Sequence, residues 1–169
     1  MRLYESHITV DGLDEGQFVK ICKSLSIKPV LIDRDTGSGV KQMMTAKFHR
    51  GSEAQAVQEM YSLAQHFPNV LRLKLETIVP PSQQAPDNRL YLEFHSKFIV
   101  PKNEIDSFVD WVESMGGHTS KNSLKYDADE GMAYYFATTR DEATMRAIIR
   151  NSPYELVNTL RECVLLDTN

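Results

Sequence analysis

The chain uses one sequence pattern twice, and this duplication constrains its fold more than any other feature. Three short motifs recur in the same order in both copies. They are Arg-Leu-Tyr at 2–4 and 89–91, Glu-x-His at 5–7 and 93–95, and Asp-x-Asp-x-Gly at 33–37 and 127–131. A repeat of this length indicates one supersecondary unit present in two copies. A duplicated, fused pair of units usually forms its binding site between the copies.

The hydrophobic pattern of the first copy predicts the element order βαββαβ. Apolar residues 18, 21, 22 and 25 fall on one helical face, whereas the flanking segments have the length and composition of strands. Ser52 and Gln55 form a capping box that opens the second helix. The expected elements are a strand at 3–10, a helix near 18–25, strands at 29–32 and 42–49, a helix from 53, and a strand at 70–79.

The second copy repeats that order, with a helix predicted to be capped by Asn103. Residues 80–88 are rich in proline and polar residues, which is typical of an exposed linker. We therefore expect an α+β protein, a tandem duplication of a βαββαβ ferredoxin-like unit with antiparallel sheets and helices on one face. The expected domains are 1–79 and 89–169, with 80–88 between them.

Composition excludes several classes of function. The chain has 169 residues, 41% of them hydrophobic, and a net charge of -4, which argues against sequence-independent nucleic-acid binding. No stretch reaches the roughly 20 apolar residues of a membrane helix. We expect a cytoplasmic protein without a cofactor. No glycine-rich phosphate loop lies between a strand and a helix.

Alternation along the strands places a set of polar residues on the sheet faces that the helices leave uncovered. These residues belong to strands of both copies, so that they line one shared cleft if the two faces oppose each other. If the sheets instead join edge to edge, the residues form a shallow polar floor. The set comprises Glu5, His7, Thr9, Arg72, Lys74, Glu76, Tyr91, Glu93, His95, Lys97, His118, Ser120 and Asn122.

The first hypothesis for this face is a site for a small anionic ligand, such as a nucleotide or phosphorylated metabolite. Cationic and imidazole donors would bind the anion, Glu93 would orient His95, and Tyr91 would offer a ring for stacking. The predicted ligand-binding residues are Glu5, Thr9, Lys74, Tyr91, Lys97, His118, Ser120, Asn122 and Arg140. The alternative is an ordinary solvated sheet face.

The second hypothesis is an enzyme. His7-Ile8-Thr9 and His118-Thr119-Ser120 resemble the paired His-x-Thr/Ser motifs of the two-histidine phosphoesterase superfamily. The resemblance implies a bilobal fold in which one imidazole is the general base and the other the general acid on a phosphodiester. The motifs occupy non-equivalent strands, and the duplicated position reads His95-Ser96-Lys97. The residues expected to carry catalysis are His7, His95 and Glu93.

A third hypothesis is a protein-interaction or inhibitory module without a small-molecule site. Exposed apolar groups on the uncovered face would indicate it, and the candidates are Leu3, Met43, Val70 and Ile78. A broader likeness spans both copies. Residues 93–95, 118–122 and 165–169 resemble a family of uncharacterised duplicated bacterial and phage proteins, which supports the fold and implies no activity.

A metal site is not expected. Both Asp-x-Asp-x-Gly segments begin like calcium loops, but they lack the later ligands and fit hairpin turns. The two Glu-x-His pairs, at 5–7 and 93–95, lie on strands that would face each other at about 10 Å, a loose distance for one shared ion.

Overall fold

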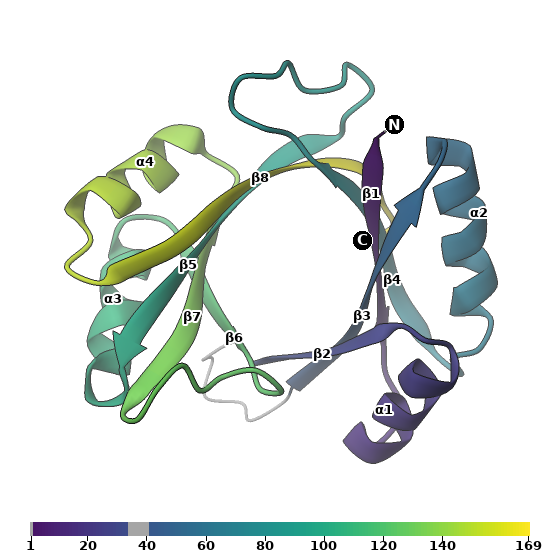
Figure 1. The fold of residues 1–169 in the computed structure, drawn as a ribbon, viewed down its shortest axis with the longest axis horizontal. Helices are drawn as coiled ribbons and strands as arrows, with labels where there is room; N and C mark the ends of the chain where they lie inside the picture. The colour runs from purple at the N-terminus through teal and green to yellow at the C-terminus, as the bar shows by residue number, and fades with distance from the viewer. Residues whose placement is uncertain (1, 34–40) are drawn as a thin grey trace.

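The structure, a computed structural model, describes residues 2–33 and 41–169 (Figure 1). Most of the first predicted Asp-x-Asp-x-Gly turn therefore lies outside the described residues. The elements follow the order βαββαβ twice. Those of the first half are β1 (Leu3–Val10), α1 (Glu15–Ser24), β2 (Lys28–Asp33), β3 (Lys41–Arg50), α2 (Glu53–Ala64) and β4 (Val70–Ile78). Those of the second half are β5 (Tyr91–Pro101), the short 3-10 helix η1 (Lys102–Glu104), α3 (Ile105–Ser114), β6 (His118–Asn122), β7 (Met132–Thr139), α4 (Glu142–Asn151) and β8 (Glu155–Asp167).

All eight strands form one closed antiparallel barrel in the order β1-β3-β2-β6-β7-β5-β8-β4 (Figure 1). The expectation of open sheets with helices on one face is therefore wrong. Within each half the strand order is the ferredoxin-like one, β4-β1-β3-β2 and β8-β5-β7-β6. The free edges of the two halves then pair with each other, β4 with β8 and β2 with β6, which removes all four edges and closes the sheet.

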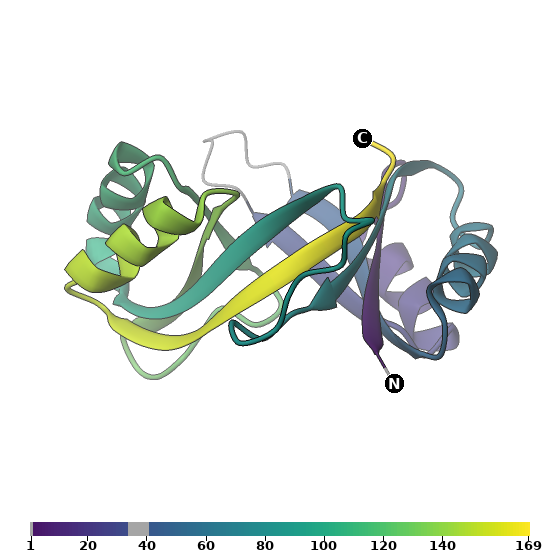
Figure 2. The same cartoon turned by 90° about the horizontal axis from the view of Figure 1, so that it is seen from above.

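The two seams of the barrel differ in length. β4 pairs with β8 from Lys74 to Ile78, with a bulge in the register. β2 and β6 share only the pairs Ile32 with Asn122 and Asp33 with Lys121. Figure 2 shows the long β5 and β8 crossing from the second half to the first. One seam is thus extended and the other short.

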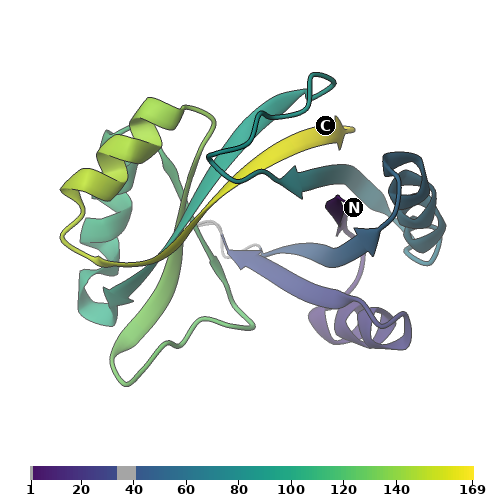
Figure 3. The same ribbon diagram turned by 45° about the horizontal axis from the view of Figure 1, so that its top comes forward.

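The helices lie outside the barrel, α1 and α2 over the first half and α3 and α4 over the second (Figure 3). Two apolar clusters fill the space under them. Ile8, Phe18 and Met60 belong to the first, and Phe108, which contacts Phe98 and Tyr135, belongs to the second. The division into domains at 80–88 stays a prediction. In β1, β4 and β5 the apolar side of the strand packs against the helices, so the polar side faces inward.

Local capping determines where helix α2 begins. The Ser52 side chain accepts a hydrogen bond from the Gln55 backbone, and the Gln55 side chain accepts one from the Ser52 backbone, as predicted. The Asn103 cap is wrong, because residue 103 lies in η1 and α3 begins after Glu104 without a side-chain cap.

Replacing Ser52 by alanine should destabilise the protein by about 1 kcal/mol, because the first turn of α2 loses its hydroxyl acceptor. Urea unfolding monitored by circular dichroism measures this change, with Ser82→Ala in the exposed linker as the control. Equal stability of the two variants would contradict the role of this cap.

Candidate functional site

The predicted site residues on the strands point into the barrel. Their neighbours along each strand, such as Ile8 and Phe94, belong to the cores under the helices, and alternation turns the next side chain the other way. Cross-strand pairs such as His7 with Lys74 and His95 with Thr138 keep this orientation from strand to strand. The closed barrel thus brings the uncovered faces of both halves together.

The first cluster on the inner wall consists of Glu5, His7 and Glu76. Glu5 of β1 and Glu76 of β4 are direct cross-strand partners. Nε2 of His7 lies 2.8 Å from Oε1 of Glu76, and Nδ1 lies 3.0 Å from the backbone oxygen of Thr45. Glu76 is 2% exposed, so this ion pair is buried.

The second cluster, Glu93, His95 and Glu162, repeats this arrangement in the other half. Glu93 of β5 lies opposite Glu162 of β8. Nε2 of His95 lies 2.9 Å from Oε2 of Glu162 and 3.5 Å from Oε2 of Glu93, while Nδ1 lies 2.9 Å from the hydroxyl of Thr138. Each Glu-x-His pair therefore gains a second carboxylate from the strand beside it.

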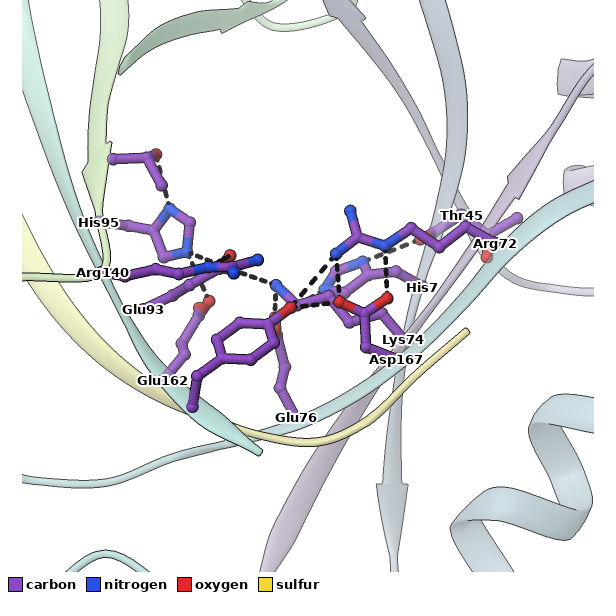
Figure 4. A network of polar contacts seen from close by, with 12 residues as sticks. His7, Thr45, Arg72, Lys74, Glu76, Glu93, His95, Arg140, Glu162 and Asp167 are labelled. Atoms are coloured by element: carbon purple, nitrogen blue, oxygen red, sulfur yellow. Dashed lines mark hydrogen bonds and ion pairs between the residues drawn. The ribbon is translucent and has the colours of Figure 1, made fainter. Parts of the chain in front are cut away.

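Lys74 joins the two clusters. Its Nζ lies 2.6 Å from Oε2 of Glu76 in the first cluster and 2.5 Å from Oε2 of Glu93 in the second. Figure 4 shows this ammonium between the two carboxylates, with the imidazoles on either side. Its contact with Glu93 is a hydrogen bond, whereas its contact with Glu76 is an ion pair outside hydrogen-bond geometry. Lys74, a side chain of the first half, thus neutralises carboxylate charge in both halves.

A second polar group extends from Lys74 along the wall. Arg72 donates two hydrogen bonds to Asp167, at 2.7 and 2.6 Å, and Tyr91 donates its hydroxyl proton to the same carboxylate. The guanidinium of Arg140 stacks 3.8 Å from the centre of the Tyr91 ring, and its Nε lies 3.6 Å from Glu93. These contacts connect β4, β5, β8 and the end of β7 (Figure 4).

Mutual attraction determines the protonation of both clusters. Burial opposes charge on His95, but the attraction of the nearby carboxylates Glu162 and Glu93 outweighs it and raises the pKa of His95 to about 10. Burial opposes charge on His7 as well, but the charge and hydrogen bond of Glu76 and the charge of Glu5 together outweigh it and raise the pKa of His7. Burial alone would raise the pKa of Glu93, yet His95 and Lys74 lower it to about 2. At neutral pH the imidazole of His95 therefore carries a proton, and the surroundings of His7 favour its protonated form.

With both imidazoles protonated the network is neutral. Its five carboxylates are those of Glu5, Glu76, Glu93, Glu162 and Asp167, and its five cations are His7, Arg72, Lys74, His95 and Arg140. An anion entering this part of the barrel would find every cation already beside a carboxylate.

A basic end of the barrel, defined by Lys28, Lys97 and Lys125, lies outside this network. Lys97 of β5 and Lys28 of β2 face inward by their cross-strand partners, and Lys125 follows β6. Burial and the charges of Lys125 and Lys28 lower the pKa of Lys97. In the described part of the chain none of the three lysines forms an ion pair. The positive charge of Lys28 also has a small electrostatic effect on Glu5.

Aromatic and polar groups accompany these lysines. Nζ of Lys97 lies 3.6 Å from the centre of the Tyr134 ring. His118 and Ser120 on β6 face the barrel beside Thr138 and Phe136. The basic end therefore combines unneutralised charge, a ring and hydroxyl groups.

The structure separates the remaining predicted residues by environment. Thr9 is buried opposite Arg72. The Asn122 side chain accepts from the backbone amides of Leu31 and Leu124, a structural role at the short seam. No contact among residues 2–33 and 41–169 joins His7 to His118, the two histidines of the phosphoesterase-like motifs.

Four important residues were not among the predicted site residues. Strand alternation places Arg72 and Glu76 on the face of Lys74, but no motif in the sequence assigns them a binding or catalytic role. Glu162 and Asp167 lie on both sides of the β8 bulge, where simple alternation fails. Lys28 was missed as well, because it begins a strand and no sequence motif marks it.

A cavity of about 340 Å³ lies beside the linker. It is lined by Arg2, Leu3, Ile78, Val79, Gln83 and Gln84. Leu3 and Ile78, two of the four apolar candidates for a protein interface, are exposed there, whereas Met43 is buried and Val70 packs against the first core.

No protein-family model and no curated protein matches the chain. Among solved structures, the acetolactate synthase small subunit from Thermotoga maritima aligns over 100% of this chain and 98% of its own, with 16% identity and a TM-score of 0.35. The ligand-free regulatory subunit of aspartate kinase from Thermus thermophilus covers 88% and 91%, with 11% identity and a TM-score of 0.36. An anthrone oxidase-like protein covers 98% and 92%, with 7% identity and a TM-score of 0.33. Similarity at these TM-scores does not inform on function.

Among the described helices, none has both the length and the apolar composition required to cross a membrane.

Proposed function

We propose that the barrel binds a small anionic ligand, of the phosphorylated or nucleotide-like class, at its basic end. The observation that carries this proposal is the contrast between two parts of the barrel. The charged clusters balance their own charges, whereas Lys28, Lys97 and Lys125 form no ion pair in the described residues. Like charges gathered without a carboxylate partner destabilise one another, and a bound anion relieves that repulsion.

The ligand contacts follow from this placement. Lys97 and Lys28 would donate charge-assisted hydrogen bonds to phosphoryl oxygens, and Tyr134 would provide an aromatic surface beside them. His118 and Ser120 on β6 are further donors. We do not extend the proposal to hydrolysis, because Thr45 and Glu76 already engage both ring nitrogens of His7.

Isothermal titration calorimetry with pyrophosphate and with adenosine monophosphate, without added metal, tests this function. Lys97→Met should weaken binding by about 10- to 100-fold, because the ligand loses one hydrogen bond to a charged group. The control is Lys47→Met, which removes an equal charge beside Glu59 on α2, outside the barrel. Absence of binding to the wild-type protein, or equal loss in both variants, would refute the proposal.

A further inference from the structure

We propose that the first cluster, Glu5, His7 and Glu76, is a binding site for one divalent metal ion of the zinc or manganese class. One ligand atom from each of the three side chains lies within 4.8 Å of the others. Imidazole nitrogen combined with carboxylate oxygen is a donor set that these ions accept. The site is distinct from the basic end, and it does not depend on the anion proposal.

The backbone fixes which nitrogen of His7 would bind the ion. Nδ1 lies 3.0 Å from the carbonyl oxygen of Thr45, and a carbonyl oxygen can only accept a hydrogen bond, so Nδ1 carries a proton. Nε2 then faces Oε1 of Glu76 at 2.8 Å, and this contact is favourable with either a proton or a metal ion between the two atoms. Metal-binding histidines commonly donate their second ring N–H in this way.

The cluster also contains a carboxylate without a donor. Glu5 makes no hydrogen bond or ion pair in the described part of the chain. Its neighbour Glu76 differs, because Oε1 lies beside His7 and Oε2 lies 2.6 Å from the Lys74 ammonium. Acceptors inside a protein are normally satisfied, so Glu5 is the member of the cluster that lacks a positive partner.

The second cluster shows what the first lacks. Glu93 is close to both Lys74 and Arg140, at 2.5 and 3.6 Å. In the first cluster the residue opposite Glu5 is Phe48 of β3. It corresponds to Arg140, which lies beside Glu93 in the second cluster. The duplication therefore left one cluster with its own guanidinium and the other without one, and a metal ion would place a cation in contact with Glu5.

The geometry requires a small adjustment. Bonds of about 2.0–2.2 Å from one ion to nitrogen and oxygen place these atoms roughly 3–3.5 Å apart. The 2.8 Å between His7 and Glu76 suits a shared proton, so the two side chains must separate by less than about 1 Å. Glu5, which has no contact to break, can turn toward the ion.

Titration of the full chain with zinc chloride in phosphate-free buffer tests the site. The wild-type protein should bind one ion, and Glu5→Gln should weaken that binding at least tenfold. This variant keeps its fold, because Glu5 makes no contact that the structure needs. The matched control is Glu162→Gln in the second cluster, which should change zinc affinity less than twofold. His7→Gln, confirmed as folded by circular dichroism, should abolish binding.

Cobalt provides a second readout, since bound Co²⁺ should give visible absorption bands that Glu5→Gln reduces. Failure of the wild-type protein to bind zinc, or unchanged affinity in Glu5→Gln, would overturn the proposal. An equal loss of zinc binding in Glu162→Gln would also overturn it, because the first cluster would then not be the site.

Discussion

Replacing Lys74 by methionine is expected to destabilise the protein by about 3–5 kcal/mol, because it leaves buried carboxylates without their shared cation. Glu76 is 2% exposed and Lys74 is 9% exposed, so water cannot replace the lost ammonium efficiently. Glu93 loses a hydrogen bond in the same variant. Whole domains are stable by only about 5–15 kcal/mol, so the variant should be close to unfolding.

Urea unfolding at pH 7 measures this loss. Lys47→Met is the control, because its contact with Glu59 is 3.9 Å long and partly exposed, and such pairs contribute about 0–1 kcal/mol. Adding Glu76→Gln to Lys74→Met should recover part of the stability, since it removes one unpaired charge. If Lys74→Met is no less stable than Lys47→Met, Lys74 does not join the two halves as the structure indicates.

Replacing His95 by glutamine is expected to cost about 3 kcal/mol near pH 6 and much less near pH 10. The pKa of His95 in the folded protein is about 10, above the value of roughly 6.5 for an unfolded chain. A pKa raised by folding contributes stability that is complete below about pH 6.5 and is lost as the pH rises toward 10. The variant has no imidazole to titrate, so its deficit should shrink over that range.

Unfolding free energies of wild type and variant at pH 6, 8 and 9.5 give this difference. His118→Gln is the comparison, because His118 also faces the barrel but forms no ion pair in the described residues. Its effect on the free energy of unfolding should be small. A deficit of His95→Gln that stays constant from pH 6 to 9.5 would show that His95 is not the charged partner of Glu162.

The element order follows from the sequence, but the closure of the barrel does not. Hydrophobic spacing reports which side of a strand packs against a helix, and in both halves it does so through residues such as Ile8 and Phe98. It carries no information on which free edges pair. The short seam at Ile32 and Asp33 depends on two residue pairs, and no local pattern marks them.

The composition of the site could be predicted only in part. Alternation of polar and apolar residues along β1, β4 and β5 is sufficient to place Glu5, Lys74 and His95 on the inner face. The bulge in β8 reverses that alternation between Glu162 and Asp167, so both face inward although their positions differ by five, an odd number. Bulges depend on tertiary pairing, which explains why these two carboxylates were missed.

The duplicated Glu-x-His motif has acquired different surroundings in the two halves. Lys74 in β4 precedes Glu76 by two residues, and the residue in the same place before Glu162 is Leu160, so one lysine neutralises carboxylates of both clusters. Shared ancestry can account for the motif itself. It does not account for the arrangement in which a cation of one half completes the charge balance of the other.

The most direct test of an anion site inside the barrel is a nuclear magnetic resonance titration of the ¹⁵N-labelled protein with pyrophosphate. We expect saturable shifts of amides in β2, β5, β6 and β7 near Lys28, Lys97 and Ser120, and no comparable shifts in the exposed helices. The same titration of Lys97→Met should require at least tenfold more pyrophosphate. Shifts that are absent, or that concentrate on the outer surface of the helices, would contradict an anion site at the basic end.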